Sequence, residues 1–519
     1  MMRSTSTSIH WLLLGLLILL KFALQYALVD SSYDLHRDEY LHLDQANHLA
    51  AGYLSVPPFT SWVAWLVKAL GNTVFWVRFF PALFGALTIV VVWKTVEELG
   101  GGLYARLLAG MAVLISALLR INMLFQPNSF DILSWTLTFY LLIRHIRTQR
   151  PLPLLWLGLI VGVGFLNKYN IVFLVIGLIP GLLLSGQGGI FKNRYLYLGG
   201  LLALLVVFPN LYWQFTHQFP VIRHMQELSA TQLQHVNRAD FWQDQLLFFF
   251  GSVFLLIGAM VGFVRYAPFK PYRFIALTYW ISMLVFTFLR AKSYYTIGLY
   301  PILLVFGSVY WEHLFREGWK RSTRPLWIGL NLALFLLLVN VIFPLLSPVE
   351  IQAKADKFKK LNLLKWEDGK DHPLPQDFAD MLGWQELTAK AQLAFSQIPD
   401  AEKPYTLVLC ENYGQAGAIN FYDKSPLPPA YSFNADYIHW YPIQQEIKAI
   451  ILVKTAGEQP LREEEKQYFS SVVNVGAIET AFAREQGTTL YLLRGVSPIM
   501  VQELRNRALE LQRSGSLSD

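Results

Sequence analysis

The most informative stretch of the chain lies at residues 30–44 and reads DSSYDLHRDEYLHLD. It directly follows the first long apolar run and begins the loop after it, and it holds five of the 13 carboxylates that precede Ser347. Ionisable groups at the edge of a membrane domain are costly and are candidates for function. We therefore predict that the string Arg37-Asp38-Glu39 carries a general base and that the neighbouring cation keeps a carboxylate ionised. The alternative is a solvated loop or a helix cap.

The rest of the chain is strongly apolar. Of its 519 residues, 54% are hydrophobic and 15% are charged, and the mean hydropathy is +0.36. Soluble domains have about a quarter charged residues. Apolar runs recur through the first two thirds, and each needs about 20 residues to cross the hydrocarbon. The pattern predicts a polytopic α-helical membrane protein with about 11 transmembrane helices. The candidate spans are 9–29, 75–96, 103–121, 128–146, 152–166, 168–186, 195–213, 244–264, 273–290, 293–313 and 325–346.

The charges divide the chain into two parts. Residues 1–346 hold 25 Lys and Arg against 13 Asp and Glu, giving +12, whereas residues 347–519 hold 18 against 23, giving −5. The basic excess fits cytoplasmic loops that face anionic lipid better than it fits nucleic-acid binding. With the N-terminus inside, every predicted inner connection carries Lys or Arg. The run at 10–29 is then an uncleaved first helix, and 152–186 is a short hairpin that turns near residues 167–170.

This topology defines the predicted domains. Residues 1–346 form the membrane domain, with a first outer loop at 30–74 that could lie along the membrane surface and a second at 214–243. Residues 347–502 form a soluble extracytoplasmic α/β domain, with strands at 406–410, 449–453 and 489–493 and helical residues near 376–397. Residues 503–519 form a polar tail. The single cysteine, Cys410, excludes an intrachain disulfide.

Several cations are predicted on the outer side, against the usual charge rule, so an anionic ligand would explain them. Arg290 and Lys292 precede Tyr294 and Tyr295 in one outer turn, and Lys168 lies in another. A lysine offers a point charge to phosphate, to which tyrosine hydroxyls can add hydrogen bonds. The alternative is snorkelling lysines with an interfacial aromatic belt. Snorkelling also accounts for Lys21 inside the first span.

Three further features have weaker signals. Asp131 is expected about a turn inside the membrane edge, where it either caps or packs against a neighbour or, if it lies near Asp38, binds substrate or metal. Pro57 and Pro58 stiffen the first outer loop. The metal question stays open: a divalent metal is possible, but the loop histidines have no strong ligand spacing and are expected to be solvated. These histidines are His36, His42, His48 and His217.

Several strings together resemble the bacterial glycosyltransferases of family 39, which are GT-C membrane enzymes related to the protein O-mannosyltransferases and the lipid A aminoarabinose transferase. The resemblance covers most of the chain in order and spacing. It rests on HRDEYL at 36–41, AAGY at 50–53, PPFTSW at 57–62, LFQPNSFD at 124–131, LNKY at 166–169, PNLYWQ at 209–214, AKSYY at 291–295 and ENYGQAG at 411–417.

Two departures matter. Asn128 stands where an acid is common in the family, which weakens the case for metal at that position. Val56 stands where the aminoarabinose transferases carry a lysine before Pro-Pro, which argues against a lipid A transferase of that type. The phosphate contact that this lysine would make must then come from another cation, such as Lys292.

The resemblance implies a GT-C fold and an inner-membrane enzyme that moves a hexose or pentose from a polyprenyl-phosphate carrier to an acceptor hydroxyl outside the cytoplasm, with inversion. The acceptor is lipid, protein or glycan. Asp38 would be the base, and Glu39 would orient the acceptor or the loop. Five residues would bind the donor phosphate, and five more would support the substrate. The first group is Lys292, Tyr294, Tyr295, Lys168 and Arg290; the second is Asp131, Arg37, Tyr40, Pro57 and Pro58.

Two other functions fit many spans with charges at the membrane edge. One is a transporter or flippase of a lipid-linked sugar, although such proteins often show internal repeats and midplane sites, and no repeat is evident here. The other is a structural subunit whose outer domain binds a partner. A single pocket that joins Asp38, Asp131 and Lys292 would favour the enzyme.

Overall fold

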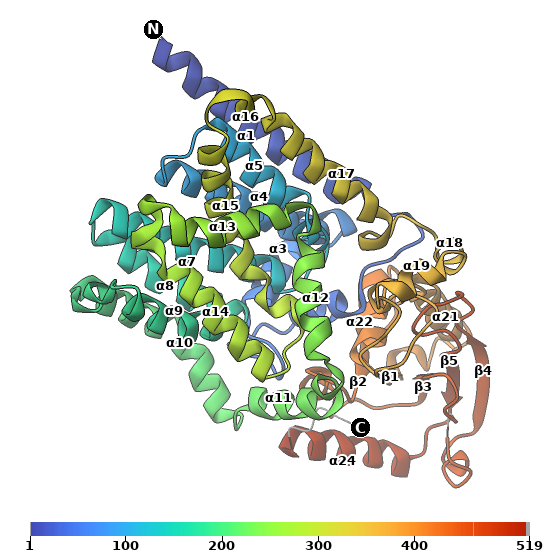
Figure 1. Ribbon diagram of the computed structural model, residues 1–519. Helices are drawn as coiled ribbons and strands as arrows, with labels where there is room; N and C mark the ends of the chain where they lie inside the picture. Colours follow the sequence, from blue (N-terminus) through green and yellow to red (C-terminus); the bar gives the residue numbers. More distant parts are fainter. Residues whose placement is uncertain (1, 460, 515–519) are drawn as a thin grey trace.

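The computed structural model describes residues 2–459 and 461–514. A large helical part comes first, and a small α/β part follows at one end of it (Figure 1). Residues 515–519 of the predicted polar tail lie outside the described residues, while most of the tail belongs to helix α24 (Pro498–Ser514).

The helices of the first part are α1 (Met2–Ala27), α2 (Arg37–Gln45), α3 (Phe59–Ala69), α4 (Val74–Glu98), α5 (Leu103–Leu114), α6 (Ala117–Ile121), α7 (Asn128–Thr148), α8 (Leu152–Asn167), α9 (Ile171–Leu184), α10 (Arg194–Thr216), α11 (Pro220–Thr231), α12 (Arg238–Phe248), α13 (Val253–Arg265), α14 (Phe274–Phe288), α15 (Tyr300–Leu314), α16 (Gly318–Ser322) and α17 (Arg324–Ile342). Short 3-10 helices are η1 (Gly188–Lys192), η2 (Leu233–His235), η3 (Phe250–Ser252), η4 (Ala267–Tyr272) and η5 (Ser293–Leu299).

Each predicted apolar segment contains a helix, and several of these helices can cross a membrane. Within the described residues, five are long and apolar enough: Ser8–Ala27, α4, α10, Ser293–Leu314 and α17. The bent pair of α12 and η3–α13 would make a sixth. Helices α5, α8, α9 and α14 are apolar but shorter. The prediction of an apolar, multi-pass helical protein is therefore confirmed, while the number of spans stays a prediction.

Two predicted spans are not continuous helices. The segment 103–121 breaks after Leu114, because Ser116 accepts a hydrogen bond from the Leu118 N–H and starts α6. The segment 244–264 bends by 69° between α12 and α13. At that bend Asn331 of α17 donates to the Ser252 hydroxyl at 2.7 Å, so a neighbouring helix occupies the break. The predicted turn near residues 167–170 is confirmed between α8 and α9.

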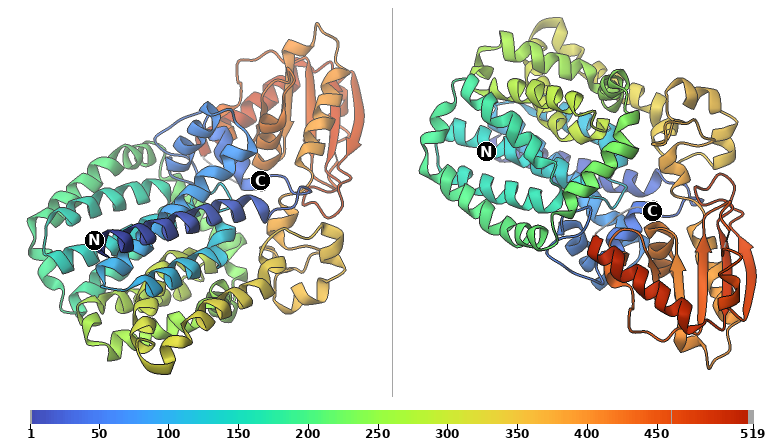
Figure 2. Two further views of the ribbon diagram at one scale, coloured as in Figure 1. Left: turned by 90° about the horizontal axis from the view of Figure 1, so that it is seen from above. Right: turned by 90° about the horizontal axis from the view of Figure 1, so that it is seen from below.

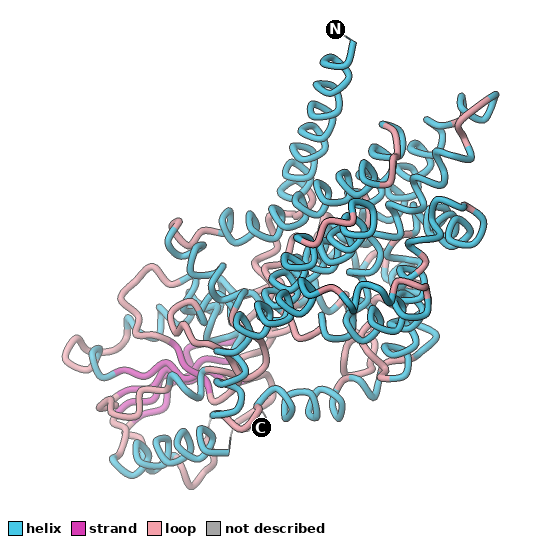
Figure 3. The backbone as a smooth tube through the Cα atoms, turned by 90° about the vertical axis from the view of Figure 1, so that its left-hand side faces the viewer, coloured by secondary structure: helices cyan, strands magenta, loops and turns pink. Residues whose placement is uncertain are grey.

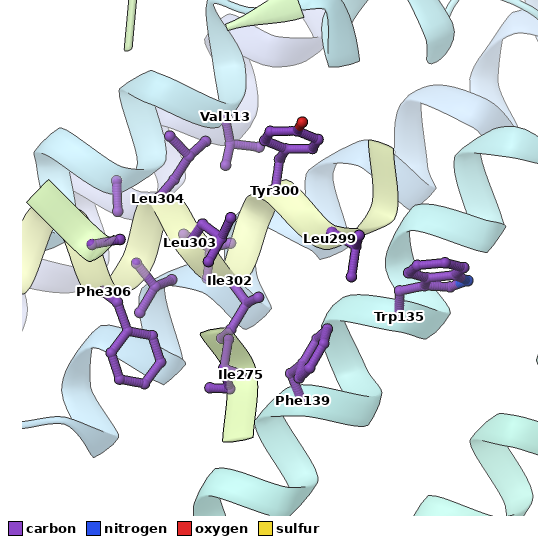
Figure 4. Packing of buried hydrophobic residues seen from close by; sticks show 14 of the residues in the cluster. Val113, Trp135, Phe139, Ile275, Leu299, Tyr300, Ile302, Leu303, Leu304 and Phe306 are labelled. Atoms are coloured by element: carbon purple, nitrogen blue, oxygen red, sulfur yellow. The ribbon is translucent and has the colours of Figure 1, made fainter. Parts of the chain in front are cut away.

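The core of the helical part surrounds α15. Figure 4 shows its buried residues packed among side chains from neighbouring helices, with Val113 of α5, Trp135 and Phe139 of α7 and Ile275 of α14 close to them. Residues 300–310 of α15 are all buried. A helix that is apolar on every side is expected at the centre of a bundle.

Lys21 contradicts its prediction. Its side chain is 2% exposed, and its ammonium donates to the Gln25 amide oxygen at 2.5 Å rather than snorkelling to an interface. Gln25 in turn donates to the Asn122 carbonyl at 2.5 Å. The buried lysine thus supports the loop between α6 and α7.

The α/β part contains a five-stranded mixed sheet in the order β2-β1-β3-β5-β4, at the end of the molecule away from the projecting N-terminal helix (Figure 3). Strand β1 is parallel to β2 and β3, and β5 is antiparallel to β3 and β4. The strands are β1 (Thr406–Cys410), β2 (Ala430–Ser432), β3 (Ala449–Lys454), β4 (Ser471–Ala477) and β5 (Thr489–Arg494). The helices are α18 (Pro348–Gln352), α19 (Ala355–Lys360), α20 (Gln376–Ala379), α21 (Trp384–Ser396), α22 (Tyr413–Tyr422), α23 (Tyr437–Trp440), η6 (Lys403–Tyr405), η7 (Lys466–Tyr468) and α24.

The two faces of the sheet have different partners. Alternate residues of a strand point to opposite faces. Leu407 and Leu409 therefore join the cluster that α24 covers, whereas Val408 and Cys410 face α21 and α22. The cluster that contains Val408 and Cys410 continues into α2 and α3 of the first outer loop, so both parts of the chain share one core.

The sequence suggested that the first outer loop could lie along a surface, but part of this loop is buried. Helix α2 is buried between the helical part and the α/β part, where Figure 2 shows the blue segment between the teal helices and the orange sheet. His36 and His42, expected to be solvated, are each 4% exposed. Only α3 keeps an exposed apolar face, which contains Trp62 and Trp65.

Candidate functional site

The start of α2 places Asp38. His36 is the N-cap residue, and its Nδ1 accepts from the Asp38 N–H at 3.2 Å. Glu39 completes the capping box by accepting from the His36 N–H at 2.5 Å. This reciprocal arrangement satisfies amides at the helix start that would otherwise lack partners. The helix cap, one of the alternatives weighed from the sequence, is therefore present, and the role of Asp38 as a base stays a prediction.

Two side chains from distant segments hold the Asp38 carboxylate. The Tyr413 hydroxyl of α22 donates to one oxygen at 2.7 Å, and the Gln126 amide donates to the other at 3.2 Å. The side chain nevertheless stays 44% exposed, so a third group can reach it. Burial alone would raise the pKa of Asp38, but His36, the Tyr413 hydrogen bond and Arg37 hold the pKa below its usual value. Asp38 is therefore ionised at neutral pH.

A chain of hydrogen bonds connects Asp38 with Lys168. Gln126, which donates to Asp38, accepts at 3.0 Å from the Asn128 amide. Asn128 in turn accepts at 2.8 Å from the Lys168 ammonium. That ammonium also lies 4.5 Å from the ring centre of Tyr295 and 5.1 Å from that of Tyr294. The base candidate and a predicted phosphate-binding cation are thus joined across three segments of the chain.

Asp131 belongs to the same neighbourhood but is buried, at 4% exposure. Its oxygens accept from Trp135 at 2.9 Å and from Asn170 at 3.1 Å. Asn170 also donates to the Tyr295 carbonyl at 2.8 Å. The structure thus favours the satisfied-residue alternative for Asp131, in which it fixes the α8–α9 turn against η5.

Lys292 lies at the outer turn between α14 and η5, where its ammonium forms an ion pair with Glu367 of the α/β part. Burial alone would lower the pKa of Lys292, but Glu367, Tyr295 and Asp38 together raise it, so the lysine stays charged. The charge of Asp38 acts on Glu367 as well. Residues 38, 292 and 367 therefore lie within electrostatic range of one another.

Glu39 has no free oxygen for a substrate among the described contacts. It is 1% exposed, and besides the His36 amide it accepts from the Phe125 N–H at 2.6 Å. Its contacts fit the orientation of the loop rather than of an acceptor. Tyr40 is fully buried against Trp384, with its hydroxyl donating to Tyr422 at 3.2 Å, and does not face the Asp38 carboxylate.

The remaining predicted residues divide into near and distant ones. The Arg37 guanidinium lies 4.4 Å from the Tyr413 ring centre, so it borders the base. Pro57 and Pro58 are buried just before α3, and Pro58 is its N-cap residue. Arg290 is exposed, has a left-handed φ of 50°, and makes no side-chain hydrogen bond or ion pair with the described residues. It is not part of the cluster.

Sequence reasoning did not single out three residues that contact the cluster: Gln126, Tyr413 and Glu367. Gln126 and Tyr413 lie in strings that had been noted as family-like, which was an available signal. Glu367 lies in a charged stretch with no motif. Its position depends on how the α/β part packs on the bundle.

A second group of charged residues, from the α/β part, contacts the N-cap residue of α2. His36 lies 3.7 Å from Asp380 and 3.9 Å from Asp377, and Arg484 donates to Asp380 at 3.0 Å. Burial alone would lower the pKa of His36, but Asp38, Asp380 and Asp377 raise it above its usual value. Among the described residues, no group of three or more His, Cys, Asp and Glu could hold a metal.

With this geometry in hand, similarity to known proteins can be considered. Residues 55–213 match the family described as dolichyl-phosphate-mannose-protein mannosyltransferase. Lipid A galacturonosyltransferase RgtD of Rhizobium johnstonii is 27% identical over 259 residues, which are 48% of this chain and 52% of that protein. The resemblance to the family 39 glycosyltransferases is confirmed. A second relative is undecaprenyl phosphate-alpha-4-amino-4-deoxy-L-arabinose arabinosyl transferase 1 of Sodalis glossinidius, 30% identical over 43% of this chain and 42% of that protein.

The chain thus spans about half the length of the curated relatives it matches. The fold likeness extends further. The crystal structure of ArnT from Cupriavidus metallidurans bound to undecaprenyl phosphate superposes with a TM-score of 0.63 at 12% identity, over 94% of this chain and 98% of that chain. The chain therefore shares the fold of ArnT, and its apolar helices indicate a multi-pass membrane protein.

Proposed function

We propose that this chain is an inverting membrane glycosyltransferase that moves a sugar from a polyprenyl-phosphate donor to an acceptor hydroxyl on the extracytoplasmic face. One observation carries the proposal: hydrogen bonds lead from Asp38 through Gln126 and Asn128 to Lys168, far apart in the sequence. Asp38 also raises the pKa of Lys292. The cluster lies where the helical part meets the α/β part. By name, one relative is a lipid A galacturonosyltransferase and the other an arabinosyl transferase of an undecaprenyl-phosphate-linked sugar.

Asp38 is the proposed general base. Its carboxylate is ionised and partly exposed, and Tyr413 and Gln126 fix its direction. A positioned base that takes the proton of the attacking hydroxyl contributes about 10²–10⁴-fold to the rate. Inversion needs only this one carboxylate at the reacting carbon, because no covalent glycosyl intermediate forms.

Lys292 and Lys168 are the proposed partners of the leaving phosphate. The carbon–oxygen bond to the carrier breaks as the acceptor attacks, and negative charge grows on the phosphate oxygens. Cations already in place stabilise that charge without reorganising. Tyr294 and Tyr295 pack beside Lys168 and can add hydroxyl donors. We place the α/β part and this cluster outside the cytoplasm, in agreement with the basic inner connections.

The first test is Asp38→Asn, which keeps the size of the side chain and one acceptor oxygen. We expect a folded, membrane-inserted protein whose transfer rate falls by about 10²–10⁴-fold. The assay follows transfer from a polyprenyl-phosphate sugar in detergent. Asp371→Asn, an exposed acid that pairs with Lys359, is the matched control. Near-normal turnover by Asp38→Asn would remove this residue from the mechanism, and transport of a lipid-linked sugar without transfer would support the flippase instead.

The second test is Lys292→Ala. Loss of the cation should weaken use of the donor more than use of the acceptor, lowering kcat/KM for the donor by about 10²-fold. Kinetics with each substrate varied in turn measure the difference. Equal losses for donor and acceptor would assign Lys292 a structural role only. Comparison of envelope glycolipids and glycoproteins with and without the gene, by mass spectrometry, would identify the sugar and the acceptor class.

A further inference from the structure

A tight turn of the α/β part reaches the membrane domain at Lys292. Residues 365–371 form it, with a β-bridge between Lys365 and Asp371. The Trp366 N–H donates to the Lys370 carbonyl at 2.9 Å, and its indole donates to the Leu374 carbonyl at 2.8 Å. These bonds define the turn without any contribution from the Glu367 side chain, which projects from it toward Lys292.

Glu367 is held from both sides. One carboxylate oxygen pairs with the Lys292 ammonium, and the other accepts from the Gln376 amide at 3.1 Å. Gln376 also accepts from the Glu367 N–H at 2.9 Å. The Glu367 side chain is 40% exposed and that of Lys292 only 18%. The carboxylate is thus more accessible than the ammonium with which it pairs.

The ion pair between Glu367 and Lys292 opposes the binding of another anion at Lys292. A phosphate that approached Lys292 would meet a carboxylate of the same sign, with Asp38 adding further negative charge nearby. Like charges brought together at a recognition site cost several kcal/mol. Lys292 cannot keep its full pairing with Glu367 and also bind a phosphate closely.

We propose that Glu367 is a specificity-determining counterion, which the phosphate of the polyprenyl donor must displace from Lys292. The inference rests on the proposed function and deepens it. In the unliganded site the carboxylate keeps Lys292 charged and directed toward the cluster. Displacement makes donor binding selective, because an anion must interact with Lys292 more strongly than a carboxylate does. Glu367 acts through Lys292 and is a positioning residue, not a catalytic one.

Glu367→Gln tests the inference, because the amide preserves the shape and the contact with Gln376 but removes the competing charge. Undecaprenyl phosphate in detergent is the probe, with binding measured by native mass spectrometry. We expect its Kd to fall about tenfold, since like-charge repulsion is relieved. The donor KM should fall in parallel while kcat changes little. Asp371→Asn, on the same turn but paired with Lys359, should leave both constants unchanged.

A double-substitution cycle with Lys292→Ala completes the test. In the Lys292→Ala background the effect of Glu367→Gln on Kd should disappear, since Glu367 and the phosphate then no longer compete for the Lys292 ammonium. Equal or weaker binding by Glu367→Gln, or lower thermal stability with an unchanged KM, would overturn the inference and leave the proposed function standing. If the unsubstituted protein bound no undecaprenyl phosphate, both the inference and the donor assignment would fail.

Discussion

At the scale of single residues, the candidate base depends on its neighbours more than on its own position. Burial alone would raise the pKa of Asp38, but His36, the Tyr413 hydrogen bond and Arg37 together keep it below its usual value. Three aspartates in turn lie within 4.0 Å of His36 and raise its pKa against the effect of burial. The charge state of the base is therefore a property of a small network that includes residues from the α/β part.

The pH dependence of transfer should report this network. The base must be ionised, so the rate is retained above the pKa of Asp38 and falls as the pH drops through it, below the usual aspartate range. His36→Asn keeps an N-cap acceptor but removes the imidazole that lowers the pKa of Asp38. We expect the acidic limb of the pH–rate profile to move to higher pH, with little change near neutrality. An unmoved acidic limb would separate His36 from the base.

At the scale of elements, the packing of α2 against α22 brings Tyr413 to Asp38. The approach is close because α22 presents glycines to α2. A Cβ at Gly417 would lie 2.8 Å from the Tyr40 Cβ and 3.0 Å from a Tyr40 backbone atom, and one at Gly414 would lie 2.6 Å from the Arg37 side chain. Helices with small residues at the contact can bring their backbones this near, and a larger residue must separate them.

Gly417→Ala should therefore disturb the site without touching it. Overpacking of this kind costs about 1–3 kcal/mol and displaces backbone. We expect a lower melting temperature in detergent and a lower transfer rate, because Tyr413 moves away from Asp38. Gly329→Ala is the control, since a Cβ there meets nothing within 4 Å in helix α17. Equal behaviour of the two variants would show that the α2–α22 contact tolerates expansion.

The sequence predicted the elements with strong local patterns. Strands β1, β3 and β5 alternate or are continuously apolar, and the prediction of each is confirmed to within one residue. Strand β2 has three residues and β4 lies at an edge with exposed positions, so neither had a clear pattern. The burial of Tyr40 and the pairing of Glu367 with Lys292 could not be predicted, because they arise only when segments more than 70 residues apart meet.

At the scale of the whole molecule, the two parts of the chain are not independent. One hydrophobic cluster unites Leu41 and Val63 of the first outer loop with Trp384 and Val408 of the α/β part. The predicted boundary at residue 347 follows the change in composition but divides this shared core. Polar contacts also cross the same junction, among them those of Asp38, Lys292 and His36.

Residues 347–519 expressed alone should therefore fail to form a stable unit. Helix α22 would expose the apolar surface that α2 covers, and exposed patches of this kind promote association. We expect aggregation, or a broad thermal transition, in size-exclusion and scanning measurements, compared with the full chain in detergent. A monomeric fragment with a sharp transition would show that the α/β part folds without the first outer loop.

The shared core also limits how this chain can be recombined with its relatives. A chimera that exchanged only the region after Ser347 would combine the α/β part of a relative with the α2 helix of this chain. The residues that replaced Tyr413 and Glu367 would then meet Asp38 and Lys292, with which they had not evolved. The unit that can be transplanted is discontinuous and includes α2 and α3 together with the sheet. Any change of acceptor preference by grafting should succeed only when both pieces travel together.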